Sequence, residues 1–385
     1  MNINELAKRL DLTPRAIRLY EAKGLLMPAR NPDNDYRVYT ERDAWRLQTI
    51  AALREIGLSL AHIQKLLLGR DDGDTARIHH ELELQRMAMV SKWVEAKSAI
   101  AVIDELIRRL ERQQDLQLSD LSQLSEQLRQ IHKSRDSWKD AWDFDRIAGE
   151  YDDDAAYYAA GPLVPVLVYE QALDLIVQWI APQTGEVGLD IGTGTGNLAA
   201  RLHGKDAVMH AIDQSAQMLA RCRAKHPFIQ AKLGNALALP YVQEQFDFIV
   251  SAFAFHHLNE TQQTLALEEM DRVLKPGGRI CLAALMEDHG ERPARQPRAE
   301  HPQTEQPPGE TPDGRAIPLD EIIQDRVHAD HTDRPAAAAG SPANAAHKYP
   351  ADRARLVEWF RGRNYITIQQ RLHDGVHAVY AVRKF

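Results

Sequence analysis

The sequence predicts a multidomain chain: a small helical unit with a winged helix-turn-helix, then a long coiled-coil helix, then an α/β domain of the Rossmann-like class. Three observations predict this order. Two short amphipathic helices joined by a tight turn open the chain, apolar residues recur at heptad spacing from Met89, and a glycine-rich turn follows an apolar run at 187–191. A length of 385 residues also exceeds one ordinary domain.

The charge of the chain is uneven. The net charge is −8 at pH 7, yet residues 1–70 hold 12 Lys and Arg against 8 Asp and Glu, so this part carries +4 and the rest carries −12. A basic head on an acidic body indicates one anionic partner at one end, and it argues against a wholly basic nucleic-acid coat.

Cysteine content and the lengths of apolar runs indicate a reducing, aqueous compartment. Only Cys222 and Cys281 are present, which excludes a disulfide framework and a cysteine-based zinc site. The sequence shows no signal-peptide pattern and no apolar stretch of membrane-spanning length. We therefore expect a cytoplasmic protein with no membrane partner.

The first forty residues have the pattern of a helix-turn-helix followed by a wing. Thr13 is a good N-cap for a second helix that starts at Pro14 and buries Ile17. The candidate DNA-binding residues are this cap, outward positions of the second helix and two residues of the wing strand: Thr13, Arg15, Arg18, Tyr20, Arg37 and Tyr39. The alternative is a small helical core without DNA binding.

Four landmarks make this region resemble the winged-helix domain of MerR-family transcription regulators. They are R-x-I-R-x-Y-E at 15–21, G-L-L at 24–26, Y-R-x-Y at 36–39 and L-R-x-I-G-x-S-L at 53–60. The resemblance places a DNA-binding domain at residues 1–70.

The resemblance also implies the partners of this domain. Members of the family bind pseudo-palindromic, double-stranded promoter DNA as homodimers and let RNA polymerase engage it. The chain departs from the family pattern at Asp35, where a glycine often precedes the tyrosine, and at Leu19, where a tyrosine is common. Neither departure threatens the fold, but Asp35 is expected to weaken one phosphate contact.

A heptad seam follows the DNA-binding region. The apolar residues alternate in steps of four and three, and they are Met89, Trp93, Ala96, Ile100, Ile103, Ile107 and Leu110. We expect a dimerisation helix and linker at 75–135, with a homodimer formed through the 75–118 helix; the alternative is one helix that packs on its own domain. The apolar phase resumes within 114–131, and the sequence leaves open whether one long helix or two result. Residues 70–140 contain no cysteine, so we expect no thiolate metal site.

The glycine turn at 192–196 has the spacing G-x-G-x-G, which differs from the dinucleotide-binding fingerprint. On its own it also fits a turn that merely packs a helix on a strand. Later landmarks strengthen the ligand-binding interpretation: a second strand that ends at Asp213, a third that ends at 234–236, and a fourth that runs into the pair His256 and His257.

This order resembles the class I S-adenosylmethionine-dependent methyltransferases, with the domain at 141–385, a seven-stranded sheet and a proline-rich insertion at 287–350. The resemblance implies S-adenosylmethionine as the cofactor. It implies these cofactor-binding residues: Asp190, Gly192, Gly194, Gly196, Asp213, Gln214, Met218, Asn235, Ala236, Ser251 and Tyr151. An aspartate is commoner at position 235, so an uncharged amide there predicts lower affinity. Tyr151 belongs to a segment, 142–154, that resembles a lid over the site.

His256 and His257 are the candidate catalytic residues, because methyl transfer to oxygen or nitrogen needs a base that removes a proton. The alternative is that both histidines are structural. Methylation of DNA bases is disfavoured, since the strand end lacks an N/D-P-P-Y/F motif and neither Cys222 nor Cys281 is placed as a nucleophile.

The insertion at 287–350 is rich in proline and poor in large apolar residues, with one helix candidate at 317–327. Its histidines are spaced irregularly, so we expect a solvated loop and no metal site. Taken together, the sequence predicts a DNA-binding transcription regulator whose C-terminal domain binds S-adenosylmethionine and methylates or senses a small molecule. The alternative is a ligand sensor that uses a methyltransferase fold without catalysis.

Overall fold

A computed structural model describes residues 1–32, 34–71, 74–112, 143–155, 164–287 and 349–384, together with residues 126, 129 and 133. The seam residues expected within 114–131, the helix expected at 317–327 and the histidines of the insertion lie outside the described residues.

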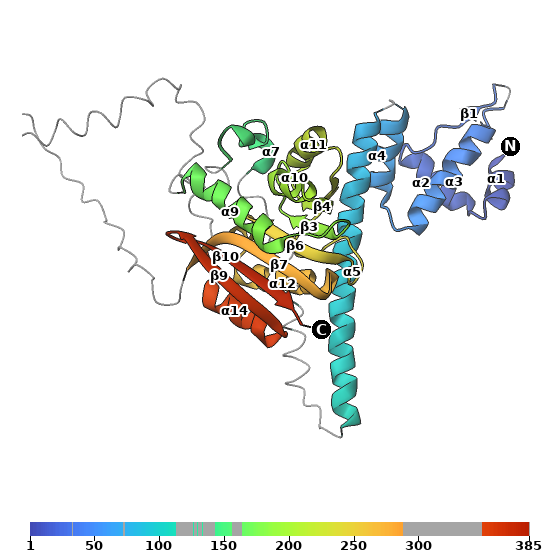
Figure 1. The fold of residues 1–385 in the computed structure, drawn as a ribbon. Coiled ribbons are helices and arrows are strands. Elements are labelled where there is room, and N and C mark those ends of the chain that lie inside the picture. Colours follow the sequence, from blue (N-terminus) through green and yellow to red (C-terminus); the bar gives the residue numbers. More distant parts are fainter. Residues whose placement is uncertain are drawn as a thin grey trace, which may run out of the picture.

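The N-terminal unit is a helix-turn-helix with a two-stranded wing (Figure 1). Its elements are α1 (Ile3–Arg9), α2 (Pro14–Ala22), β1 (Ala29–Arg30), β2 (Arg37–Val38), α3 (Glu41–Glu55) and α4 (Leu60–Asp71). Thr13 caps α2 as the sequence predicts, because its hydroxyl accepts the backbone N–H of Ala16 at 3.1 Å. The apolar faces of the helices meet in one core around Ile17 and Leu47.

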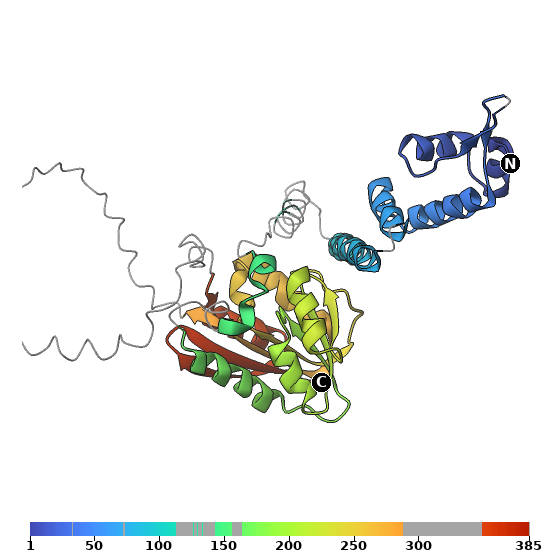
Figure 2. The same cartoon turned by 90° about the horizontal axis from the view of Figure 1, so that it is seen from above.

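One long helix, α5 (Thr75–Glu111), follows the N-terminal unit. The carboxylate of Asp74 caps it by accepting the N–H of Arg77 at 2.9 Å. Its 37 residues correspond to about 55 Å of helix. Figures 1 and 2 show α5 between the N-terminal unit and the sheet domain, and it packs against α4 on one side and against the edge of the sheet on the other.

The C-terminal part is an α/β domain. Its strands are β3 (Val187–Ile191), β4 (Val208–Asp213), β5 (Gln230–Leu233), β6 (Phe246–Ala252), β7 (Leu274–Glu287), β8 (Ala351–Asp352), β9 (Tyr365–His373) and β10 (Val376–Arg383). The sheet has the order β5-β4-β3-β6-β7-β10-β9, and the short β8 pairs with β7 outside this path. β3 to β7 are parallel, whereas β10 is antiparallel to both β7 and β9. The sheet thus has eight strands, one more than the seven predicted, because the short β8 adds to β7, and the predicted closing hairpin is confirmed.

Helices cover both faces of this sheet (Figure 1). α9 (Val166–Ile180), α10 (Asn197–His203) and α11 (Ala216–Lys225) share one apolar core, whereas α12 (Glu260–Val273) and α14 (Arg353–Gly362) share the other. Three short elements complete the domain: α7 (Phe144–Ile147), η1 (Tyr151–Asp154) and η2 (Phe255–His257).

The strand order positions the site. β3 lies between β4, which comes after it in the chain, and β6, so the chain reverses its direction of travel across the sheet there. Ligands of open α/β sheets bind beyond the carboxyl ends of the strands at such a reversal. In this sheet the carboxyl end of β3 leads directly into the glycine turn at 192–196.

Candidate functional site

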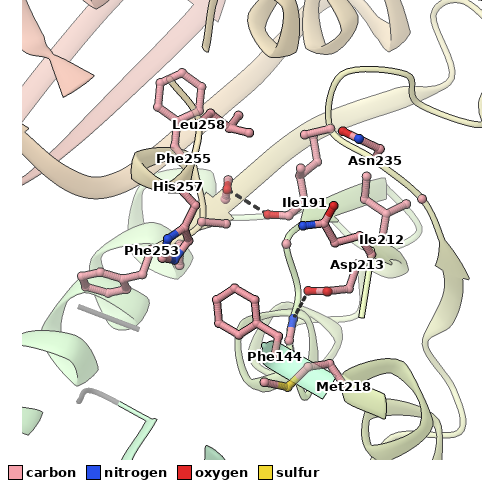
Figure 3. Close-up of a pocket in the computed structure, with 18 of the residues that line it drawn as sticks. Phe144, Ile191, Ile212, Asp213, Met218, Asn235, Phe253, Phe255, His257 and Leu258 are labelled. Carbon is pink, nitrogen blue, oxygen red and sulfur yellow. Dashed lines mark hydrogen bonds between the residues drawn. The ribbon is translucent and has the colours of Figure 1, made fainter. Parts of the chain in front are cut away.

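A cleft that is partly open to solvent lies beyond the carboxyl ends of the parallel strands. It is lined by Phe144, Tyr151, Ile191, Gly192, Gly194, Ile212, Asp213, Gln214, Met218, Gly234, Asn235, Ala236, Ser251, Ala252, Phe253, Ala254, Phe255, His257, Leu258 and Met270. Figure 3 shows Asp213 and Asn235 on one side of this cleft and the aromatic residues on the other. We call these sides the polar end and the aromatic end.

The glycine turn forms the floor of the polar end. Gly192 and Gly196 have positive φ angles of 71° and 91°. A Cβ at Gly192 would lie 2.3 Å from the Cβ of Ala254, and one at Gly196 would lie 2.7 Å from the sulfur of Cys222. The backbone therefore passes too close to its neighbours for any side chain, and the left-handed angles also favour glycine.

Asp213 is held in place by its own backbone surroundings. Its Oδ2 accepts the N–H of Gly194 at 2.9 Å, and its Oδ1 accepts the N–H of Ser215 at 2.9 Å. A carboxylate oxygen can accept more than one hydrogen bond, so these backbone contacts do not exclude bonds from a ligand in the cleft. A carboxylate fixed in this way at the end of β4 suits a ligand with two neighbouring hydroxyl groups.

Gly234, Asn235 and Ala236 lie next to Asp213 and begin the segment after β5. The amide oxygen of Asn235 accepts the N–H of Leu237 at 2.8 Å, which fixes this side chain in a tight turn. The oxygen that the sequence assigns to a ligand contact thus already accepts one bond. Gln214 and Met218 close the same end of the cleft from α11 and the residues before it.

Two of the predicted cofactor-binding residues do not line the cleft. Gly196 lies behind it, at the start of α10, and Asp190 is buried beneath the turn, where its carboxylate accepts the hydroxyl of Thr193 at 2.8 Å. Burial raises the pKa of Asp190 to about 7; the bond from Thr193 opposes this rise, whereas the charge of Asp213 adds to it. Asp190 therefore supports the turn from below.

The aromatic end is built from segments that are far apart in the sequence. Phe253, Phe255, His257 and Leu258 follow β6, and Phe144 comes from the lid segment (Figure 3). The ring centroids of Phe144 and His257 lie 5.4 Å apart in an edge-to-face arrangement. Sequence reasoning missed the phenylalanines and Leu258; the one available signal was their position beside the predicted histidine pair.

The structure separates the two candidate histidines. His257 lines the cleft, whereas His256 is fully buried behind it. The backbone carbonyl of His256 accepts the N–H of Tyr349, and its ring contacts that of His257 at a centroid distance of 4.4 Å. Only His257 is therefore placed to meet a ligand.

Phe253, at the end of β6, has a φ angle of 56°, a conformation that costs energy for a bulky residue and is concentrated at functional sites.

The lid segment is fastened over the glycine turn by two carboxylates. Asp145 accepts the hydroxyl of Ser215 at 2.6 Å, and Asp152 accepts the hydroxyl of Thr195 at 2.5 Å and pairs with Lys225 at 2.7 Å. Between these two carboxylates, Tyr151 lies against Gly194, where it lines the cleft. Burial raises the pKa of Tyr151 well above its ordinary value, so this phenol remains protonated.

The predicted DNA-binding residues divide into two groups. Thr13, Arg15, Arg18 and Arg37 are exposed, and Arg37 pairs with Glu21 at 2.8 Å. The partly outward position predicted for Tyr20 is wrong, because this side chain is only 8% exposed. Tyr39, predicted to contact phosphate from the wing, is only 2% exposed.

The helix period explains the burial of Tyr20, and packing in the core explains that of Tyr39. Tyr20 lies three residues after the buried Ile17 and so falls on the same helix face. Tyr39 enters the core of the N-terminal unit, where its hydroxyl donates to Glu21. Both tyrosines therefore stabilise the unit from inside.

The predicted seam on α5 is exposed along its C-terminal half. Ile100, Ile103, Ile107 and Leu110 are each between 47% and 57% exposed in this single chain.

Among the described residues, no helix combines the length and the apolar character that crossing a membrane requires.

Two families match separate parts of the chain. Residues 1–70 match the family described as "MerR HTH family regulatory protein", and residues 189–278 match the family described as "Methyltransferase domain". The second match covers the glycine turn, Asp213, Asn235 and both histidines.

Methyltransferases are among the curated relatives of this chain. An "Uncharacterized methyltransferase" of Anoxybacillus flavithermus is 34% identical over 115 residues, which cover 30% of this chain and 52% of the relative. A ubiquinone/menaquinone biosynthesis C-methyltransferase of Rubrivivax gelatinosus is 37% identical over 108 residues, which cover 28% of this chain and 42% of the relative. The chain thus spans about half the length of the relatives it matches.

Among solved structures, the 1,6-didemethyltoxoflavin-N1-methyltransferase of Burkholderia thailandensis aligns with a TM-score of 0.39 and 14% identity, over 64% of this chain and 88% of that one. The two family matches agree with the two folds described above. Residues 1–70 thus match a MerR-type helix-turn-helix region, and the C-terminal part of the chain contains a methyltransferase domain that includes residues 189–278.

Proposed function

We propose that this protein is a DNA-binding transcription regulator whose C-terminal domain transfers a methyl group from S-adenosylmethionine to an apolar small molecule. One observation carries the proposal: a single cleft joins the fixed carboxylate of Asp213 to an aromatic end that contains His257. The same chain carries exposed arginines on the second helix of its helix-turn-helix.

The polar end fits the cofactor. Asp213 would accept both ribose hydroxyls, since a carboxylate oxygen can accept a further bond beside its backbone contact. Gly192 and Gly194 would allow close approach of the methionine part, with Tyr151 above it. Asn235 and Ala236 would face the adenine edge, with Gln214 and Met218 beside it. Ser251 lies under the reacting region, where its hydroxyl donates to the carbonyl of Ile191 at 2.8 Å.

The aromatic end limits the acceptor. Within the described part of the chain, the residues that line this end offer aromatic rings, aliphatic groups and the imidazole of His257, and no Lys, Arg, Asp or Glu. An ionic acceptor would lose its hydration there without a partner. We therefore propose a neutral, largely apolar and planar acceptor with a hydroxyl or ring nitrogen as its nucleophile.

His257 is the proposed general base. The bound cofactor supplies an electrophilic methyl carbon, and the imidazole of His257 would take the proton that the acceptor's oxygen or nitrogen loses. Phe144 holds the ring through its edge-to-face contact. The lid carboxylates Asp145 and Asp152 fasten the covering segment and so help to exclude water.

Methylation of a DNA base remains disfavoured. The phenylalanines and histidines after β6 replace the amide or acid and the prolines that grip a flipped base. Cys222 and Cys281 are both buried, and among the described residues neither lines the cleft.

A ligand sensor without turnover is the second candidate function. One observation favours it: the amide oxygen of Asn235 is already engaged by Leu237, which leaves a weaker acceptor for the adenine amino group. A regulator also needs only a ligand that binds two states of the protein with different affinity.

Native mass spectrometry of the full chain purified from its host would identify any retained small molecule. Incubation with methyl-labelled S-adenosylmethionine should then move label onto that molecule, and His257→Ala should slow the transfer by about 100-fold or more. A retained molecule that alters DNA affinity while no label moves would select the sensor instead.

For the DNA-binding half, we propose that the protein acts in the cytoplasm as a homodimer. The exposed seam of α5 would form the dimer contact, and RNA polymerase would engage the bound promoter. Footprinting on DNA next to its own gene should show protection that Arg15→Ala combined with Arg18→Ala removes. Arg361→Ala combined with Arg371→Ala, at two exposed positions of the sheet domain, removes the same two charges and should protect the DNA normally.

A further inference from the structure

The contacts between α5 and the sheet domain gather at the two ends of one loop. This loop, residues 234–241, follows β5, and its first three residues line the cleft. Among the described residues, none of α5 lines the cleft. The contact therefore connects the helix that carries the N-terminal unit with the polar end of the cleft.

Glu83 makes the contact at the start of the loop. This carboxylate is only 5% exposed, although it lies on a long helix outside the sheet domain. It accepts the N–H of Leu233 at 3.1 Å and pairs with Arg223 at 2.9 Å. Arg86, one turn further along α5, donates to the carbonyl of Leu233 at 3.2 Å. Both backbone polar groups of Leu233 are thus held by α5, directly before Gly234.

The charge of Glu83 is maintained in this buried position. Burial by itself would raise the pKa of Glu83, but the N–H of Leu233 and the charge of Arg223 outweigh it, so the pKa lies below its ordinary value. A buried ion pair of this kind is costly to break, because removal of one partner leaves the other as an unpaired buried charge.

Trp93 makes the contact at the far end of the loop. The guanidinium of Arg272 lies 4.8 Å from the ring centre of Trp93. Arg272 also donates to the carbonyls of Leu239 and Tyr241, at 3.0 and 2.8 Å, and pairs with Glu269 at 2.7 Å. Glu269 in turn accepts the N–H of Leu239 at 2.8 Å.

The two contacts lie ten residues apart on one helix, which is about 15 Å along its axis. The same helix is joined to the N-terminal unit next to the first contact, since Lys65 of α4 pairs with the buried Glu81 at 3.1 Å. A shift of α5 therefore has to move the loop or break buried bonds. In the same way, a ligand that orders the loop has to restrain α5.

We propose that Glu83 is a positioning residue for the cofactor site and that, through it, occupancy of the cleft and the placement of α5 are coupled. The proposal rests on the cofactor binding proposed above. Coupling of this kind is reciprocal. If DNA binding changes the placement of α5, it changes cofactor affinity by the same factor by which the cofactor changes DNA affinity.

The test uses the full chain and S-adenosylhomocysteine as the probe. Calorimetry should show that Glu83→Ala weakens binding about tenfold, and Glu83→Gln less, since an amide oxygen can still accept the N–H of Leu233. Glu105→Ala is the matched control, because Glu105 lies on α5 but pairs only with Arg108 and Arg109 in the described chain. Should Glu83→Ala fail to fold, Trp93→Ala tests the second contact at a half-exposed side chain.

Hydrogen exchange supplies a measurement that a merely structural role would not move. The probe should slow amide exchange of α5 around residues 81–95 in the wild type and in Glu105→Ala, but not in Glu83→Ala. Equal affinity of Glu83→Ala and wild type, or exchange in α5 that ignores the probe, overturns the proposal. If the wild type itself fails to bind the probe, the proposed cofactor function is refuted, and this inference with it.

Discussion

The two ends of the cleft are built in different ways. The polar end consists mainly of backbone: glycines in left-handed conformations, a carboxylate held by two N–H groups, and a loop that follows β5 directly. The aromatic end consists of side chains from the lid and from the residues after β6, packed ring against ring. A backbone site of this kind recognises a ligand of constant shape, whereas a side-chain site can change its ligand by substitution. The difference supports the proposed binding of the cofactor at the first end and of the acceptor at the second.

The largest expected effect separates chemistry from cofactor binding. Replacing His257 with alanine removes the proposed base, so the rate constant for methyl transfer should fall by about 10²- to 10⁴-fold. Affinity for S-adenosylhomocysteine should stay within about twofold, as measured by calorimetry, because the imidazole lies at the aromatic end.

His256→Gln is the matched neighbour for this experiment. The buried His256 does not line the cleft. Its replacement should therefore lower the melting temperature and leave the rate of methyl transfer close to that of the wild type. A similar loss of rate in both variants would contradict the assignment of the base to His257.

The second effect is the converse and acts at the polar end. Asp213→Ala removes the proposed ribose contact and also leaves the N–H groups of Gly194 and Ser215 without their acceptor. Affinity for S-adenosylhomocysteine should fall about 100-fold, or about 2.7 kcal/mol. Asp213→Asn retains one acceptor oxygen and should lose less. Unchanged affinity in Asp213→Ala would remove the cofactor from this end of the cleft.

The third effect concerns pH and the support beneath the glycine turn. Burial raises the pKa of Asp190 to about 7, so the folded state holds its proton more tightly than the unfolded chain does. The stability from this group is complete below the ordinary pKa of an aspartate, about 4, and is lost as pH rises towards 7. Between pH 6 and 8 the wild type should lose about 1 kcal/mol more unfolding free energy than Asp190→Asn, measured by urea titration of both proteins. Parallel pH profiles for the two proteins would show that Asp190 is already ionised at pH 6.

The smallest expected effect is a gain of cofactor affinity at the polar end. Asn235→Asp places a charged acceptor where the adenine amino group is expected, while a carboxylate oxygen can still accept the N–H of Leu237. Calorimetry should show affinity for S-adenosylmethionine increased about fivefold. Asn235→Ala should weaken it by a similar factor, and a decrease in both variants would place the adenine elsewhere.

The sequence by itself determined the parts of the molecule that are short and contiguous. The cap at Thr13, the glycine turn, Asp213 at the end of β4 and the closing hairpin were all predicted, because each rests on local backbone geometry. The polar end of the cleft could be predicted in the same way, since its residues follow consecutive parallel strands whose ends meet at one edge of the sheet.

Tertiary structure alone decided which residues of a predicted set share a surface. It placed His257 in the cleft and His256 behind it, and it turned Tyr20 and Tyr39 into the core, although neighbouring positions look alike in the sequence. A shift of one position changes the direction of a side chain, and packing decides that direction where several patterns fit.

The contact between Glu83 and Leu233 shows the same limit at long range. These residues are separated by 150 positions, and nothing in the segment around Glu83 distinguishes it from the other charged residues of α5. Its burial follows from the meeting of a helix and a sheet edge, whose placement depends on the summed packing of both domains. Local pattern therefore determined the two halves of this protein, whereas the connection between them arises only when they pack against each other.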